Sequence, residues 1–342
     1  MAVDVANCRL QVPPQADQPT AGTNHDGECF GRIGVLMGGP STEREISLKS
    51  GNAVYESLKG IGLDVIALDI KTAGREENLH LIKSSGISCA FVALHGYFGE
   101  DGKIQVILDE AGIPYTGSGA EASRLAMDKV ASRAIFQDKG IRVPRSEIVL
   151  KDSSFSPGDL CAALGLPLVV KPATQGSSVG LSIVDKEQDM PAALALALSF
   201  DEKAIVEEYI RGRELTVGIL EEKALPVVEI IPKHRFFDFE AKYQYGLTEY
   251  IVPAELDPTV SLELADNALR AHNALGCSGC SRVDIILAKG NTPFVLEINT
   301  IPGLTATSLL PKAAKAAGID FSHLCATLIR LAYEKAKNKS TR

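Results

Sequence analysis

Short apolar runs alternate with amphipathic stretches through the first third of the chain. The runs have the length of strands, and the stretches carry apolar residues at helical spacing. The predicted strands are residues 32–39, 63–70, 87–96 and a short 114–117, and the predicted helices are residues 41–60, 75–84 and 102–112. Thr42 and Glu45 have the spacing of a capping box at the start of the first helix. Strands that alternate with helices are typical of a parallel α/β sheet, so we expect an N-terminal domain over residues 31–120.

The pattern becomes denser in strands after residue 121. One long helix is predicted over residues 123–140, and one more near residues 187–199. The predicted strands are residues 143–150, 166–173, 180–185, 204–210 and 213–220. Closely spaced strands with few helices between them are typical of an α+β arrangement. We therefore expect a small central domain over residues 121–213.

The last part of the chain is predicted to begin another sheet at residues 224–232. A long loop over residues 233–258 follows it. The remaining predicted elements are a helix at 259–275, a hairpin of strands 281–290 and 292–299, and helices at 308–317 and 321–338. We expect these elements to form a C-terminal domain over residues 214–342.

Composition restricts the class of protein. Residues 1–30 contain three prolines and no apolar period, which predicts a poorly ordered tail. The net charge of −8 argues against nucleic acid or an anionic membrane as a partner. The seven cysteines include one C-x-x-C, Cys277 and Cys280, without a second pair to complete a zinc site. With no apolar run of about 18 residues and no signal sequence, we expect free thiols in a cytoplasmic protein.

The predicted hairpin carries the first candidate chemistry. Side chains alternate along a strand, so Arg282 and Asp284 share one face, and Glu297 and Asn299 share one face of the partner strand. The hairpin therefore brings together three oxygen donors, which are ligands that Mg²⁺ prefers. Polar alternation is also normal on a solvent-exposed sheet face, and the strands by themselves leave both interpretations open.

A second candidate is the segment KPATQGSSVG at residues 171–180. Lys171 ends an apolar strand, and the glycines of the following turn let the backbone approach a phosphate closely. The order of residues differs from that of a P-loop. An ordinary Gly/Ser hairpin explains the turn equally well. Lys129, by itself, is only a residue at the start of a helix.

Other polar residues follow the ends of predicted strands. Glu207, Glu208 and Glu214 surround an apolar strand end, where they can bind an adenine edge and a ribose or simply face solvent. His95 follows the carboxyl end of a strand, the edge at which parallel α/β sheets bind ligands. Glu43 lies at a helix start, where an acid also stabilises the helix dipole.

In their joint order these segments resemble the D-alanine–D-alanine ligase family of the ATP-grasp superfamily. The resemblance runs from about residue 32 to 336 through the segments GGPSTEREISLKSG, ALHGYFGEDG, PYTGSGAEASRLAMDK, VVKPATQGSSVG, VEEYIRGRELTV, FDFEAKY, SRVDIIL and LEINTIPGLTATSLLP. It implies an ATP-grasp fold of mixed α/β and α+β type. That fold has an N-terminal parallel-sheet domain, a small central lid domain and a C-terminal mixed-sheet domain.

The resemblance also implies a role for individual residues. ATP would be bound by Lys129, Lys171, Ser178, Glu207, Tyr209, Ile210 and Glu214. Two Mg²⁺ or Mn²⁺ ions would be bound by Asp284, Glu297 and Asn299. D-Alanine would be bound by His95, Lys242, Ser308 and Leu309. Catalysis would involve Glu43, Ser177, Tyr243, Arg282 and Gly303.

The implied reaction has two steps. The carboxylate of one D-alanine attacks the γ-phosphate of ATP, and the amine of a second D-alanine then attacks the acyl phosphate. Arg282 and the N–H of Gly303 would form an oxyanion hole. Ser177 and Tyr243 would link to Glu43 and close a loop over the site, which excludes water. The chain departs from many relatives at two places. The turn ATQGSS lacks the charged pair that they carry before the glycine, and Ile301 replaces a residue that is often Ser, Met or Leu.

Alternatives remain at this point. D-Lactate-adding relatives commonly carry His at the loop position of Tyr243, so Tyr243 favours an amine acceptor over D-lactate. A D-alanine–D-lactate or D-serine ligase and a non-catalytic ATP-binding protein are the competing interpretations. The resemblance further implies a homodimer, because relatives usually pair through the N-terminal domain.

Overall fold

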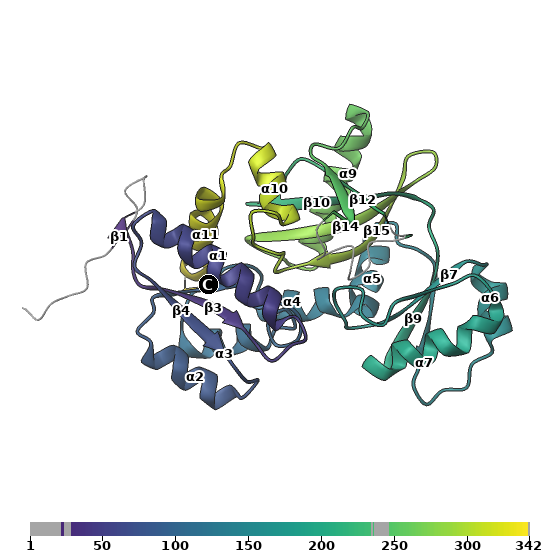
Figure 1. The fold of residues 1–342 in the computed structure, drawn as a ribbon, viewed down its shortest axis with the longest axis horizontal. Helices are drawn as coiled ribbons and strands as arrows, with labels where there is room; N and C mark the ends of the chain where they lie inside the picture. Colours follow the sequence, from purple (N-terminus) through teal and green to yellow (C-terminus); the bar gives the residue numbers. More distant parts are fainter. Residues whose placement is uncertain (1–21, 24–28, 234, 236–245, 341–342) are drawn as a thin grey trace, which may run out of the picture.

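The computed structural model describes residues 22–23, 29–233, 235 and 246–340. Figure 1 shows an elongated molecule with an N-terminal sheet at the left, a central sheet at the right and a C-terminal sheet between and above them. Of the predicted tail, residues 22–23 and 29–30 are described, and they pair as the short antiparallel strands β1 (Gly22–Thr23) and β2 (Cys29–Phe30). Phe30 is buried and stacks on Tyr333.

The N-terminal sheet is parallel, as the alternating pattern predicts. Its strand order is β4-β3-β5, and every residue of the central strand is buried because helices cover both faces. The strands are β3 (Ile33–Gly38), β4 (Val65–Ile70) and β5 (Cys89–Val92), and the helices are α1 (Arg44–Gly60), α2 (Arg75–Ser84) and α3 (Lys103–Ala111). The strand predicted at 114–117 is a single bridge between Ala90 and Tyr115.

The predicted start of the first helix is wrong in detail. Thr42 and Glu45 form no capping box, because α1 begins at Arg44 and its N-cap residue Glu43 makes no side-chain cap bond. Instead the Ser41 hydroxyl accepts the N–H of Glu43 at 3.1 Å and donates to the carbonyl of His95 at 2.6 Å. These bonds hold residues 41–43 as a turn against the sheet edge.

The long helix predicted at 123–140 is two helices, α4 (Ala120–Met127) and α5 (Lys129–Asp138). The break lies at Asp128, whose carboxylate accepts the N–H groups of Val130 and Ala131 at 2.9 and 3.0 Å. Asp is a favoured N-cap residue, and this cap starts a new helix inside an otherwise continuous apolar period. The break places Lys129 in the first turn of α5.

The central sheet is antiparallel, in the order β6-β9-β7-β8. Its elements are β6 (Ser146–Leu150), α6 (Pro157–Leu164), β7 (Leu168–Pro172), β8 (Ser182–Val184), the 3₁₀ turn η1 (Glu187–Asp189), α7 (Met190–Phe200) and β9 (Lys203–Glu208). Helix α6 was not predicted. Ser156 caps it by accepting the N–H of Asp159 at 3.2 Å, and Pro157 occupies its first position.

The C-terminal sheet has the strand order β13-β12-β10-β14-β15, with β11 paired to β10. Its elements are β10 (Gly212–Leu220), β11 (Lys223–Ala224), β12 (Val228–Pro232), β13 (Thr248–Ile251), α9 (Pro258–Ala274), β14 (Cys280–Ala288), β15 (Thr292–Asn299), α10 (Leu309–Ala316) and α11 (Phe321–Ser340). Strand β10, predicted with the central strands, belongs to this sheet. Its described pairings are all antiparallel, where a mixed sheet was expected.

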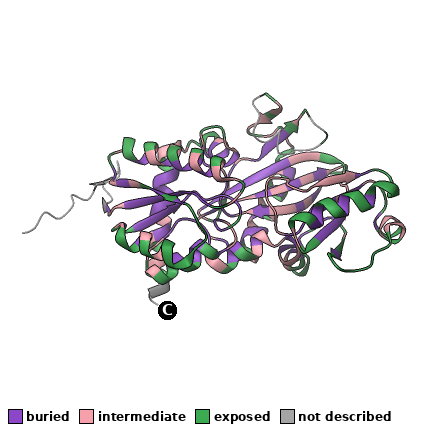
Figure 2. Ribbon diagram, turned by 60° about the horizontal axis from the view of Figure 1, so that its bottom comes forward, coloured by how far each residue is buried: buried purple, intermediate pink, exposed green. Residues whose placement is uncertain are grey.

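The hydrophobic clusters show which elements share a core. One cluster joins Val54 and Leu58 of α1 to Val228 of β12 and to Leu328 and Ile329 of α11, so the N-terminal and C-terminal sheets share a core. The central sheet has a separate core, formed with α6 and α7 by residues from 149 to 206. Figure 2 shows buried strands beneath helices with exposed outer faces in both parts. The central sheet, which we call the lid, can therefore move as a unit against the rest, which we call the body.

Candidate active site

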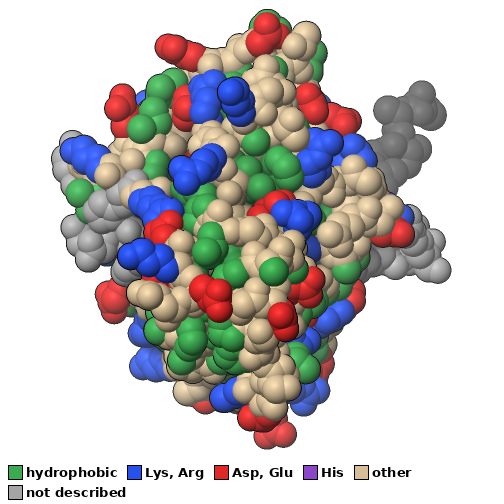
Figure 3. All heavy atoms as spheres, turned by 90° about the vertical axis from the view of Figure 1, so that its right-hand side faces the viewer, with side chains coloured by type: hydrophobic (Ala, Val, Ile, Leu, Met, Phe, Trp, Pro, Cys, Tyr) green, Lys and Arg blue, Asp and Glu red, His purple; other side chains and the backbone are tan. Residues whose placement is uncertain are grey.

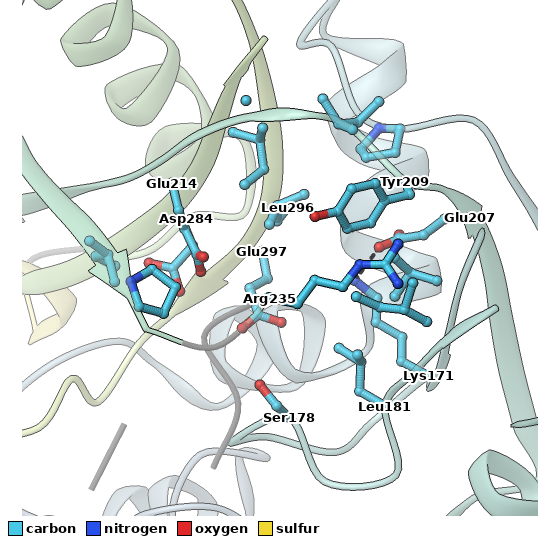
Figure 4. Close-up of a pocket in the computed structure, with 18 of the residues that line it drawn as sticks. Lys171, Ser178, Leu181, Glu207, Tyr209, Glu214, Arg235, Asp284, Leu296 and Glu297 are labelled. Atoms are coloured by element: carbon cyan, nitrogen blue, oxygen red, sulfur yellow. Dashed lines mark ion pairs between the residues drawn. The ribbon is translucent and has the colours of Figure 1, made fainter. Parts of the chain in front are cut away.

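A cavity of about 380 Å³ lies between the lid and the C-terminal sheet. Every residue predicted to bind ATP lines it: Lys129, Lys171, Ser178, Glu207, Tyr209, Ile210 and Glu214. Figure 4 shows Lys171, Glu207 and Tyr209 on the lid side and Glu214, Asp284 and Glu297 on the opposite side. Strand β10 carries Glu214 into the cavity, where it pairs in register with Ile230 and Ile286. The polar residues converge on an otherwise apolar slot, as in many small-molecule sites.

Glu207 and Lys171 form an ion pair inside this cavity, with Nζ 2.9 Å from Oε1. They lie on the neighbouring strands β9 and β7, and the guanidinium of Arg133 on α5 also pairs with Glu207. Burial would raise the pKa of Glu207, but the charges of Lys171 and Arg133 outweigh it and lower that pKa from its ordinary value. Glu207 is therefore a carboxylate that accepts hydrogen bonds and donates none.

Arg235, which lines this cavity, is held by contacts with the lid. Arg235 bonds to the Asp185 carboxylate of the lid at 2.7 Å, and its guanidinium lies 5.3 Å from the ring centre of Tyr209. The Tyr209 N–H donates to the carbonyl of Pro167 at 3.2 Å. Neither Arg235 nor Asp185 was predicted.

Asp284, Glu297 and Asn299 lie on one face of the β14–β15 hairpin, as predicted. Asp284 pairs in register with Glu297, and Arg282 with Asn299. The Arg282 guanidinium donates to both carboxylate oxygens of Asp284, at 3.1 and 3.0 Å, and Lys129 Nζ lies 3.3 Å from Glu297. Two carboxylates and an amide oxygen, held beside cationic side chains, are a donor set that fits a hard divalent cation.

A second cavity, of about 400 Å³, adjoins the first and shares Lys129, Gly176 and Glu297 with it. It is lined by the remaining described residues of the predicted set: Glu43, His95, Ser177, Arg282, Asn299, Gly303, Ser308 and Leu309. The predicted Lys242 and Tyr243 lie outside the described residues. The two cavities are similar in volume and meet at these three shared residues.

The lid and the N-terminal sheet touch at Glu43. The Ser177 hydroxyl donates to the Glu43 carboxylate. Ser177 and Ser178 both have left-handed backbone angles, φ 52° and 58°, which strain a residue other than glycine. Gly96 leaves room for the same carboxylate, since a Cβ there would lie 2.5 Å from its Oε2. The bond between Ser177 and Glu43 holds the lid turn over the second cavity.

His95 is held from both sides. Its Nε2 lies 2.9 Å from the Ser50 hydroxyl of α1, and its Nδ1 lies 3.5 Å from Glu100. The N–H of Leu304 also donates to the Ser50 hydroxyl, at 3.4 Å. Burial and the charge of Glu43 raise the pKa of Glu100, against the opposing effects of His95 and the Gly96 N–H.

The loop after β15 completes the second cavity. The Ser308 hydroxyl accepts the N–H of Thr305 at 3.1 Å, and Ser308 precedes the first residue of α10. A Cβ on Gly303 would lie 2.9 Å from that hydroxyl, so the backbone of Gly303 approaches Ser308 closely. Asn299 fixes the start of the loop, because its side-chain oxygen accepts the N–H of Ile301 at 3.0 Å.

Sequence reasoning missed several residues that shape the site, among them Ser50, Glu100, Arg133, Thr216 and Arg235. Thr216 is buried, and its hydroxyl lies 2.6 Å from Asp284. Glu100 follows His95 in the quoted segment ALHGYFGEDG, so a signal for it was present in the sequence. The partners of Ser50 and Arg133 are 45 and 74 positions away, and no local pattern predicts them.

A parallel N-terminal sheet, an antiparallel lid and a cavity between the lid and the C-terminal sheet define an ATP-grasp fold. The family model described as D-ala D-ala ligase C-terminus matches residues 135–330, and that of the D-ala D-ala ligase N-terminus matches residues 72–118. The chain belongs to the D-alanine–D-alanine ligase family.

Individual relatives agree with the family models. A D-alanine–D-alanine ligase of Pelotomaculum thermopropionicum is 46% identical over 312 residues, which cover 89% of this chain and 97% of the relative. One of Geobacter sulfurreducens is 43% identical over 309 residues, which cover 90% and 96%. The solved structure of the Bacillus anthracis ligase complexed with ATP matches with a TM-score of 0.79 at 34% identity, covering 90% of this chain and 99% of that one.

Surface and hydropathy add two observations. The face at the lid end intersperses lysine and arginine with acidic side chains, as Figure 3 shows. Within the part of the chain that the structure describes, no helix is both long enough and apolar enough to cross a bilayer.

Proposed function

We propose that this protein joins two molecules of D-alanine to D-alanyl-D-alanine, with conversion of ATP to ADP and phosphate, for the synthesis of peptidoglycan precursors. The observation that carries the proposal is the pair of adjoining cavities that share Lys129 and Glu297. ATP in the first cavity would bring its terminal phosphate to the wall of the second, where the amino acid would lie. The names of the relatives and the ATP complex of the Bacillus anthracis ligase support the same assignment.

The first step forms a D-alanyl phosphate. One carboxylate oxygen of the first D-alanine attacks the γ-phosphorus, and the bond from that phosphorus to the β-phosphate oxygen breaks. Negative charge accumulates, so catalysis rests on cations and positioning. Lys129 and Lys171 line the nucleotide cavity and supply positive charge to the phosphates. The Glu43 carboxylate binds the ammonium of the first D-alanine, and His95 lies near its carboxylate.

Mg²⁺ or Mn²⁺ fits the hairpin, and we assign Asp284, Glu297 and Asn299 as the residues that hold two such ions. When bound, the ions neutralise charge on the phosphates. Arg282 and Lys129 pair with Asp284 and Glu297, so both cationic side chains lie beside the proposed metal ligands.

The second step forms the peptide bond. The amine of the second D-alanine, after losing a proton, attacks the carbonyl carbon of the acyl phosphate, and phosphate leaves. Arg282 and the N–H of Gly303 stabilise the oxyanion that develops in this step. Ser308 and Leu309, together with Lys242, bind the second D-alanine. No side chain acts as a nucleophile, in keeping with cysteines whose pKa burial raises to about 12, as at Cys280.

Closure of the lid excludes water, which would otherwise hydrolyse the acyl phosphate. The bond from Ser177 to Glu43 supports this role, because it ties the lid turn to the residue proposed to bind D-alanine. We propose that Tyr243 joins the same contact and selects an amine acceptor. We further propose a cytoplasmic homodimer with the domains 31–120, 121–213 and 214–342. The free cysteines among the described residues support the cytoplasm.

The test is release of phosphate from ATP and Mg²⁺ with D-alanine alone, with the product identified by mass. We expect D-alanyl-D-alanine, and we expect D-lactate to fail as a competing acceptor. Phosphate release that requires D-lactate and yields an ester would contradict the assignment of Tyr243. Binding of ATP without phosphate release in either mixture would contradict the proposed activity.

A further inference from the structure

Arg133 is buried on α5 and anchored at both amino ends. One amino group pairs with the Glu207 carboxylate, and the other donates to the carbonyl of Pro144 at 2.9 Å. The exposed fractions are 4% for Arg133 and 3% for Glu207, so water screens this pair little. The guanidinium therefore fixes the orientation of the Glu207 carboxylate inside the nucleotide cavity.

The cluster contains two cations for one carboxylate. Lys171 occupies the other oxygen of Glu207 at 2.9 Å, so Glu207 is paired on both oxygens. If Lys171 were the only cation beside Glu207, a phosphate of ATP that attracted Lys171 would leave the buried Glu207 carboxylate without a counter-charge. An unpaired buried charge costs free energy. With Arg133 in place, Glu207 keeps a cation whether Lys171 points to it or to the phosphates.

We propose that Arg133 is a positioning residue that determines nucleobase specificity by keeping Glu207 ionised and fixed while Lys171 serves the phosphates. The proposal rests on the proposed function and takes Glu207, which lines the nucleotide cavity, as the residue that contacts the base. An ionised carboxylate accepts a hydrogen bond from the 6-amino group of adenine and repels the 6-oxo group of hypoxanthine or guanine. A protonated carboxyl could donate to the oxo group, and the discrimination would then be lost.

The experiment compares ATP with inosine triphosphate, which replaces the 6-amino group of the base by an oxo group. kcat and KM for each nucleotide are measured with saturating D-alanine and Mg²⁺. We expect the wild type to prefer ATP by about 100-fold in kcat/KM, because an unmatched polar group in a buried site is strongly rejected. Arg133→Met should reduce this preference to roughly tenfold or less, mainly through KM for ATP. Arg133→Lys should restore much of it.

Two controls separate this role from a loss of folding. Arg145→Met removes a comparable arginine that pairs with the neighbouring Glu208 but is largely exposed, and it should leave the preference unchanged. In a Glu207→Gln background, Arg133→Met should change the ATP preference much less than in the wild type, because Arg133 acts through Glu207. An equal loss of kcat/KM for both nucleotides in Arg133→Met, with the preference intact, would overturn the proposal.

A binding measurement keeps this proposal distinct from the proposed function. ATP and inosine triphosphate are each used to displace a fluorescent ATP analogue from the full chain, without D-alanine. A wild type that prefers ATP and loses the preference in Arg133→Met supports the role of Arg133 even if no dipeptide is made. A wild type that binds both nucleotides equally overturns it.

Discussion

Replacement of Ser50 by alanine tests whether α1 positions the substrate-binding side of the second cavity. Ser50 is fully buried, and its hydroxyl joins His95 Nε2 at 2.9 Å to the N–H of Leu304 at 3.4 Å. It therefore connects the segment after strand β5 to the loop that carries Gly303. Ser50→Ala removes this connection without adding bulk, so neighbouring side chains need not move.

The expected magnitude follows from the partners that are lost. A buried polar group left without a partner costs about 1–3 kcal/mol. The contact with Leu304 is long, so the loss is dominated by His95, and we expect a free energy of unfolding lower by about 2 kcal/mol. If the shift of His95 costs about 1.4 kcal/mol of the binding free energy of the first D-alanine, KM for that substrate rises about tenfold.

Ser47→Ala is the matched control. Ser47 lies one turn earlier on α1, is also fully buried, and donates to the carbonyl of Ala93 at 2.7 Å, but it does not line the cavity. Thermal unfolding and initial rates over a range of D-alanine concentrations are measured for both variants. We expect similar losses of stability and an increase in KM for Ser50→Ala alone. Equal kinetic effects in the two variants would refute the positioning role.

Three further predictions follow from contacts in and around the site. Ser177→Ala should raise KM for D-alanine and increase ATP hydrolysis without dipeptide formation, because the lid turn loses its bond to Glu43. If the ratio of phosphate released to dipeptide formed stays unchanged, this prediction is wrong. The hydroxyl of Thr216 lies 2.6 Å from Asp284, so Thr216→Val should weaken Mg²⁺ binding by about 10–100-fold. Metal titrations that follow both binding and activity measure this effect. Burial lowers the pKa of His272 from 6.5 to about 4. Between these two pH values, His272 binds a proton in the unfolded chain but stays neutral in the folded protein. The free energy of unfolding therefore falls by about 3 kcal/mol as the pH drops from 6.5 to 4. His272→Gln should flatten that part of the pH profile in thermal unfolding, and a profile unchanged by the substitution would exclude His272 as its cause.

Much of the site could be predicted from the sequence because its parts obey short-range rules. Side-chain alternation placed Asp284, Glu297 and Asn299 on one face of a hairpin, and the register confirms this placement. The strand end at Lys171 and the turn after it were also local patterns. The resemblance to the ligase family supplied the order in which these patterns come together.

The remaining features depend on contacts between distant parts of the chain. Apolar period alone could not reveal the break at Asp128, because the period continues through it while the carboxylate caps a second helix. Strand β10 follows the lid strands closely, but it pairs with β14, about 70 positions later. Arg133 was an ordinary residue of a predicted helix until the fold brought it to Glu207. Such ion pairs are decided by tertiary packing, which a single sequence does not display.

With Glu43 proposed to bind the ammonium of D-alanine, the bond from Ser177 to Glu43 makes the position of the lid and the binding of D-alanine parts of one equilibrium. If D-alanine favours the closed lid by some factor, then closure favours D-alanine by the same factor. A compound that enters the nucleotide cavity only when the lid is open would therefore compete with D-alanine, although the two never touch. Its potency should fall as the concentration of D-alanine rises, and an inhibitor that binds the closed lid should instead gain potency under the same conditions.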